Sequence, residues 1–150
     1  MDKEEIKNEV RIHFRSRKDN QRKMERNPNY KADAAKNSRK DTKLTNRIKA
    51  LKKLNVDKEA KKAISAILIR PIMSSDEEEI DGQTKTFIVR KPRWRTDGIT
   101  SCFKTLDGTY QNNQSKHSLF RLMKRIDGPP SEREEPEWSE RMRTAIQFFD

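Results

Sequence analysis

The feature that most limits this chain is the imbalance between its charged and its apolar side chains. Charged residues make up 39% of the 150 residues, whereas hydrophobic residues make up 31%. Leu, Ile, Val and Phe together supply only about a fifth of the chain, which is typical of sequences that bury a small core. We therefore expect one small folded unit flanked by long polar segments, and two large domains are excluded.

The charge is arranged in blocks. Residues 11–70 contain 20 basic and 6 acidic residues, and residues 71–82 contain 5 acidic residues and no basic ones. Residues 83–128 are basic again, with 10 basic residues against 3 acidic ones. This alternation predicts three parts: a basic helical arm over 1–70, a disordered acidic linker over 71–86 and a small helical module over 87–150.

Apolar residues in the basic arm recur at helical spacing. A first helix is expected over residues 3–26, ended by the proline of Asn27-Pro28-Asn29. Asp57 is expected to be the N-cap of a later helix that ends before Pro71. Between these helices, a short coiled-coil-like pattern stops before two heptads. The three apolar stripes are Ile6, Val10 and Phe14; Leu44, Ile48 and Leu51; and Ala60, Ile64, Ile67 and Leu68.

The module over 87–150 carries clearer signals of a core. Thr96 or Asp97 is expected to cap a helix that runs to Tyr110, and residues 83–89 alternate as in a strand. The predicted fold class is therefore mainly α, with at most one short strand. The three helical stripes of the module are Ile99, Phe103, Leu106 and Tyr110; Leu119, Phe120, Leu122, Met123 and Ile126, ended by Gly128; and Trp138, Met142, Ala145 and Phe149.

The sequence shows no catalytic motif. Its four glycines are isolated, so no phosphate-binding glycine loop is present. One cysteine and two histidines cannot supply the four ligands of a structural zinc site, and Cys102 is expected to be a small buried hydrophobe. We expect no enzyme, no cofactor and no metal. No apolar run reaches the ~20 residues of a membrane span, and the charged N-terminus does not resemble a signal peptide, so an intracellular protein without membrane contact is expected.

The density of Lys and Arg over residues 11–70 favours non-specific binding of DNA or RNA, although a solvated spacer is the open alternative. Arg22-Lys23 and a cluster beginning at Lys36 fit a bipartite nuclear-import signal, which predicts a nuclear protein. Arg93 and Arg95 flank Trp94 in an extended segment that could lie in a minor groove, but we favour Trp94 as a core residue. The candidate nucleic-acid-binding residues are Arg22, Lys23, Lys36, Arg39, Lys40, Arg47, Lys49, Lys52, Lys53, Arg93 and Arg95.

Ser74 and Ser75 each have an acidic residue three positions later, which is the context that acidophilic kinases accept. Phosphorylation would add about two negative charges at each site, within the acidic block. We therefore expect a phosphorylatable linker that competes with external polyanions for the basic blocks. A solvated acidic spacer that is never modified is the alternative.

Several short segments follow one another in a recognisable order: SSDEEE, RWRTD, CFKTLDGTY, SKHS and GPPSER, within residues 73–138. In this order the chain resembles a family of proteins from transposon-rich invertebrate genomes, in which an acidic serine stretch precedes a Trp-Arg helix start. That family has no assigned activity, so the resemblance implies no site residue. The module also resembles Myb/SANT and MADF three-helix modules, which implies that Trp94 packs against later helices.

These observations predict a nuclear, non-enzymatic protein that binds nucleic acid or chromatin through its basic arm. The alternative is a protein–protein adaptor whose C-terminal aromatic side chains bind a partner protein. The aromatic residues in question are Trp94, Phe103, Tyr110, Trp138 and Phe149.

Overall fold

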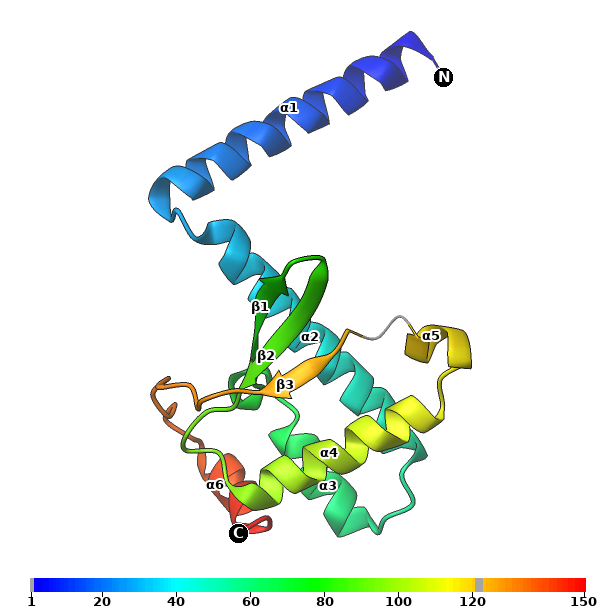
Figure 1. Ribbon diagram of the computed structural model, residues 1–150, viewed down its shortest axis with the longest axis vertical. Coiled ribbons are helices and arrows are strands. Elements are labelled where there is room, and N and C mark those ends of the chain that lie inside the picture. The colour runs from blue at the N-terminus through cyan, green and yellow to red at the C-terminus, as the bar shows by residue number, and fades with distance from the viewer. Residues whose placement is uncertain (1, 121–122) are drawn as a thin grey trace. The chain divides into compact units, whose positions relative to one another are not determined.

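The computed structural model describes residues 2–120 and 123–150, and Figure 1 shows the order of its elements. The chain is mainly helical and contains a three-stranded mixed sheet. It forms two compact units, Met1–Ala35 (unit 1) and Lys36–Asp150 (unit 2), and the boundary between them lies within helix α2. The predicted boundaries at residues 70 and 86 are therefore not those of the compact units.

Unit 1 contains helix α1 (Lys3–Arg26) and the first turns of α2 (Tyr30–Lys53). The Glu5 carboxylate accepts a hydrogen bond from the Asp2 backbone N–H at 3.0 Å, which satisfies a free donor at the start of α1. At the other end, the Asn27 side chain accepts from the Asn29 N–H at 3.0 Å and stabilises the break at Pro28. The helix predicted over 3–26 and its end are confirmed.

The core of unit 2 is formed by α2, α3 (Lys58–Ile67), α4 (Asp97–Asn112) and α6 (Glu140–Gln147). The N-caps predicted for α3 and α4 are confirmed, because Asp57 and Thr96 accept hydrogen bonds from the third residues of their helices. Two short helices complete the unit, the 3-10 helix Arg70–Ile72 and α5 (Lys116–Phe120). The core side chains are Ala50, Ile64, Ile67, Leu68, Ile72, Met73, Ile99, Phe103, Leu106 and Ala145.

The sheet has the order β1-β2-β3 and consists of β1 (Ser75–Asp81), β2 (Thr84–Arg90) and β3 (Arg125–Asp127). Strands β1 and β2 pair antiparallel, and β2 and β3 pair parallel. Asp81 lies opposite Thr84, so the hairpin is closed by two residues, and Gly82 at the first of them has a φ of 61°. A positive φ at this position is typical of a type II′ turn and favours glycine.

The prediction of a disordered acidic linker over 71–86 is wrong, because these residues contain β1 and the start of β2. The prediction of at most one short strand is wrong for the same reason. The acidic side chains of β1 are held by basic side chains of α2, β2 and β3, so long-range ion pairs order a segment of low strand propensity. Figure 1 shows β1 and β2 running alongside α2.

The predicted helix over residues 119–126 is also corrected. Residues 116–120 form α5, whereas Ile126 lies in β3, where it pairs with Ile88 of β2. Leu122, which we assigned to that helix, lies outside the described residues. The parallel pairing explains the strand, because backbone hydrogen bonds to β2 outweigh a weak local helical pattern.

Candidate nucleic-acid interface

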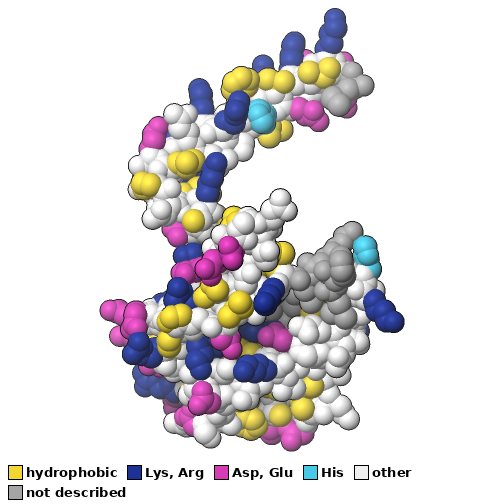
Figure 2. All heavy atoms as spheres, in the orientation of Figure 1, with side chains coloured by type: hydrophobic (Ala, Val, Ile, Leu, Met, Phe, Trp, Pro, Cys, Tyr) yellow, Lys and Arg dark blue, Asp and Glu magenta, His cyan; other side chains and the backbone are white. Residues whose placement is uncertain are grey.

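Helix α1 carries a continuous row of cations. The row has a residue at every third or fourth position over the whole helix, which places its members on one face. No residue of α1 is buried, and Figure 2 shows Lys and Arg side chains (dark blue) along its length. We call these residues the α1 row: Lys3, Lys7, Arg11, Arg15, Lys18, Arg22 and Arg26.

The cations of the α1 row are almost free of acidic partners. Among the described residues, the one ion pair formed by the row joins Lys7 to Glu4 at 3.8 Å, and both side chains are about two-thirds exposed. Such a pair is worth little, and cations four residues apart repel one another along a helix. The α1 row therefore presents unneutralised positive charge.

An apolar stripe lies beside the row on α1. Ile6 and Val10 are about half exposed, and Phe14 and Met24 are also exposed. These residues are four, four and ten positions apart, so they share a face of the helix. His13 lies on this same stripe and is exposed. No element formed by the described residues of unit 1 covers the stripe.

The basic residues of α2 in unit 2 have a different environment. Lys36 pairs with Glu77 at 3.5 Å and Arg39 with Glu78 at 3.6 Å. Arg39 also donates to the backbone carbonyl of Asp76, at 2.8 Å from Nη2. Two of the predicted nucleic-acid contacts therefore hold strand β1 in place.

Asp76 is the centre of this charge network. Its side chain is fully buried and forms ion pairs with Lys43 of α2 and, at 3.1 Å, with Arg125 of β3. Burial lowers the pKa of Lys43 to about 8, although the neighbouring Asp76 carboxylate acts in the opposite direction. These two ion pairs link α2 to β1 and β3, the two edge strands of the sheet.

Arg47 and Arg95, both predicted to bind nucleic acid, lie in the interior of unit 2. Arg47 donates two hydrogen bonds of 2.8 Å to the carboxylate of Asp107. The Phe103 ring has a guanidinium over it from each arginine, at 4.3 Å for Arg47 and 5.3 Å for Arg95. Both arginines therefore pack against Phe103 in the folded unit.

The other predicted contacts are distributed over both units. Arg22 belongs to the α1 row, while the Lys23 ammonium lies over the Tyr30 ring at 5.3 Å. Arg93 is exposed and forms an ion pair with Glu132. Burial, followed by the charges of Arg133, Arg70 and Lys36, lowers the pKa of the half-buried Lys40. Exposed lysines at the end of α2 complete the set: Lys49, Lys52 and Lys53.

Ser74 and Ser75 differ in their access to solvent. Ser74 is 2% exposed, and its hydroxyl accepts a hydrogen bond of 3.0 Å from Arg95. Ser75 is half-buried at the first position of β1, opposite Arg90. A kinase can reach the Ser74 hydroxyl only if β1 separates from the unit, which the sequence context did not indicate.

The aromatic side chains of the alternative adaptor hypothesis are used within the fold. Trp94 and Trp138 contact each other edge to face, with ring centroids 5.5 Å apart. The Trp94 indole also donates to the backbone carbonyl of Arg133 at 2.9 Å. Phe103 is buried, and Tyr110 and Phe149 pack against the core. The expected role of Trp94 as a packing residue fits these contacts.

Sequence reasoning missed most of the α1 row, namely Lys3, Lys7, Arg11, Arg15, Lys18 and Arg26. In this helix only Arg22 and Lys23 were selected, because they fit the bipartite nuclear-import pattern. The signal that identifies the row is the spacing of three or four residues between successive cations, applied to charge instead of to apolar side chains.

Comparison with known proteins was made at three levels. No protein-family model, no curated protein and no solved structure matches this chain.

Two further kinds of feature, a metal centre and a membrane-spanning helix, are not found among the described residues. These residues contain no group of three or more His, Cys, Asp or Glu side chains that could hold a metal ion. None of the helices they form is both long and apolar enough to cross a bilayer. Cys102 is half-buried beside the core, and burial raises the pKa of its thiol, which keeps the thiol protonated at neutral pH.

Proposed function

We propose that this protein binds nucleic acid without sequence preference, through the α1 row. The observation that carries the proposal is the row itself: seven cations on one face of a helix, with one weak ion pair between the row and a described carboxylate. Lys and Arg at such density neutralise phosphates and release condensed counterions. The basic residues of unit 2 contribute less, because most of those predicted as contacts have acidic or buried surroundings.

The dimensions of α1 suit a duplex. From Lys3 to Arg26 the helix rises by about 35 Å, at 1.5 Å per residue. Duplex DNA carries one negative charge per ~1.7 Å of its axis, so phosphates are available along the whole row. A helix also fits the major groove of B-DNA. We therefore expect about five of the seven cations to contact phosphates.

The proposal is tested by the salt dependence of binding. A labelled duplex is titrated with the full chain by fluorescence anisotropy at several salt concentrations. With about five phosphate contacts, log K should fall against log salt with a slope of about −4.5. The variant Arg15→Gln/Lys18→Gln/Arg22→Gln should lower the slope to about −1.8, because three contacts are lost.

A matched control variant removes three positive charges from α3 instead of α1. Lys58→Gln/Lys61→Gln/Lys62→Gln changes three lysines of α3 and should leave the slope near −4.5. A slope near zero for the wild type, or equal losses in the two variants, would overturn the proposal. Tighter binding to anionic lipid vesicles than to the duplex at the same salt would assign α1 to a membrane surface, since α1 also has an apolar stripe.

Nuclear residence is the second part of the proposal. Arg22 and Lys23 lie on the fully exposed helix α1, where an import receptor can reach them. The cluster from Lys36 is less accessible, because Lys36 and Arg39 are paired with acidic residues of β1. Microscopy of a fluorescent fusion should show nuclear enrichment that Arg22→Gln/Lys23→Gln abolishes, while Lys58→Gln/Lys62→Gln leaves it unchanged.

A further inference from the structure

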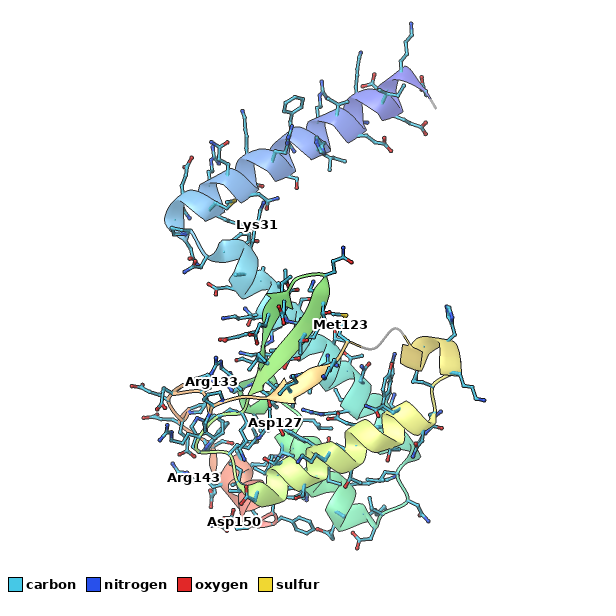
Figure 3. The ribbon with its side chains drawn as sticks, in the orientation of Figure 1. Lys31, Met123, Asp127, Arg133, Arg143 and Asp150 are labelled. Atoms are coloured by element: carbon cyan, nitrogen blue, oxygen red, sulfur yellow. The ribbon has the colours of Figure 1, made fainter. Side chains whose placement is uncertain are left out.

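A cavity of about 450 Å³ lies in unit 2, among α2, α4 and the ends of β2 and β3. Figure 3 labels Asp127, which lies at the end of β3 on its wall. Two carboxylates, Asp107 and Asp127, line the cavity. The cations that line it are three times as many: Lys43, Arg47, Lys91, Arg95, Lys104 and Arg125.

Three of these cations form direct ion pairs with carboxylates. Arg47 is paired with Asp107, and Lys43 and Arg125 share the buried Asp76. Lys91 has a loose contact of 3.7 Å with Asp97, whose side chain is almost fully exposed. Arg95 and Lys104 form no ion pair with a described residue. The cavity therefore has an excess of positive charge that the protein itself does not neutralise.

Arg95 is the strongest indication of a missing anion. It is 8% exposed, and its hydrogen bonds go to neutral acceptors: the Ile72 carbonyl at 3.1 Å, the Ser74 hydroxyl and the Thr100 hydroxyl at 3.2 Å. No hydrogen bond joins its Nη2 to a described residue, so this nitrogen can donate to a ligand. Burial, followed by the charges of Arg47 and Arg133, lowers the pKa of Arg95 to about 10, although Asp107 and Asp127 act in the opposite direction. A buried cation that forms no direct ion pair is costly, and an anion in the cavity would lower that cost.

The shape of the cavity indicates the size of the anion. Its wall follows α4 from Thr100 to Gln111, a rise of about 16 Å. Arg95 lies at the start of this wall, and the Tyr110 side chain lies near its end. A volume of about 450 Å³ is within the range of small-molecule sites and far exceeds the size of a single phosphate ion.

We propose that this cavity binds a phosphate-bearing ligand of up to nucleotide size. Arg95, Lys91 and Lys104 hold the phosphate oxygens, because guanidinium and ammonium groups form strong charge-assisted hydrogen bonds with phosphate. The Tyr110 side chain offers an aromatic surface for a base at the other end. The site lies wholly in unit 2 and does not depend on nucleic-acid binding by α1.

The test is calorimetric titration of the full chain in which the α1 row carries Arg15→Gln/Lys18→Gln/Arg22→Gln, so that binding by α1 is reduced. Three probes are compared: adenosine diphosphate, inorganic pyrophosphate and adenosine. We expect saturable binding of the diphosphate, and at least about tenfold weaker binding of adenosine, which lacks the phosphates. Pyrophosphate that binds as tightly as the nucleotide would identify an inorganic phosphate site, and weaker binding would identify a nucleotide site.

Two variants locate the binding within the cavity. Lys104→Gln and Lys91→Gln remove cations that are not needed to hold the core, and each should weaken binding of the diphosphate by about tenfold. Lys62→Gln on α3 removes the same charge outside the cavity and should have no effect. Absence of saturable binding by both phosphate probes, equal affinities for adenosine and the diphosphate, or an equal loss in Lys62→Gln would overturn the proposal.

Discussion

In α1, seven cations at helical spacing have almost no acidic partners among the described residues, whereas four cations of α2 in unit 2, at similar spacing, each contact a carboxylate. Lys36 contacts Glu77, Arg39 contacts Glu78 and Lys43 contacts Asp76, all in β1. Arg47 contacts Asp107 in α4. Spacing along a helix thus creates a row of charge, but acidic residues elsewhere in the sequence determine whether that row is free to bind a polyanion.

The largest effect is expected from Asp76→Asn. The change leaves Lys43, whose side chain is 11% exposed, without its carboxylate, and breaking a buried pair costs ~3–5 kcal/mol. Urea denaturation followed by the fluorescence of Trp94 and Trp138 measures this loss. Glu79→Gln on the same strand is the control, because Glu79 is exposed and forms no ion pair with a described residue, and it should cost no more than ~0.5 kcal/mol. Equal costs in the two variants would contradict a central role for Asp76.

The second effect is a pH dependence of stability that comes from Lys43. Its pKa is about 8 in the folded chain and 10.5 ordinarily, so the folded state binds this proton less tightly. Below pH 8 Lys43 is protonated in both the folded and the unfolded state, so the folded state bears the full free-energy cost of burying a charged ammonium group. Above pH 8 the folded state loses the proton first, so the free energy of unfolding should rise by up to ~3 kcal/mol as the pH approaches 10.5.

The measurement compares the wild type with Lys43→Met by urea denaturation at intervals from pH 7 to pH 10. The wild type should gain stability relative to the variant across this range, since the variant has no proton to lose at this position. If the stabilities of the wild type and the variant changed in parallel with pH, burial would not lower the pKa of Lys43.

A third prediction asks whether α2 can be made to behave like α1. Glu77→Gln/Glu78→Gln removes the acidic partners of Lys36 and Arg39. If these two cations then contact phosphates, the salt slope of duplex binding should become steeper by about 1.8. An unchanged slope would mean that the position of α2 in the fold, and not its ion pairs, prevents binding.

The smallest effect is expected on the free energy of unfolding of unit 2 when three cations of the α1 row are removed. Arg15→Gln/Lys18→Gln/Arg22→Gln changes exposed residues of unit 1, so the unfolding of unit 2 should shift by less than ~0.5 kcal/mol. Both tryptophans lie in unit 2 and report on it directly. A larger loss would show that the α1 row contributes to the stability of unit 2.

Local signals allowed much of the helical structure to be predicted. Three of these signals are local: the end of α1 just before Pro28, the N-caps Asp57 and Thr96, and the apolar stripe from Ile99 to Leu106. Each depends on residues within a few positions of one another. The strand β2 was also predicted, from its alternating pattern. In these elements the local preference and the tertiary packing agree.

The acidic strand could not be predicted in this way. Residues 76–79 are four consecutive acids, which in isolation favour a solvated chain. Their order depends on Lys43, which is 33 residues away from Asp76, and on Arg125, which is 49 residues away. A long separation also explains why Arg47 was proposed as a nucleic-acid contact, because its partner Asp107 is 60 residues away. Arg95 forms hydrogen bonds with Ile72 and Ser74, which are 23 and 21 residues away.

The central claim, that α1 is free to bind polyanions while α2 is neutralised within the fold, is tested most directly by two variants of equal charge. In one, Arg11 and Arg15 are changed to Gln; in the other, Lys36 and Arg39, which are paired with Glu77 and Glu78, are changed to Gln. The measurement is the salt dependence of duplex binding by each full chain. We predict that the slope of log K against log salt falls by about 1.8 in the α1 variant and stays at the wild-type value in the α2 variant. An equal fall in both variants, or a larger fall in the α2 variant, would contradict the account.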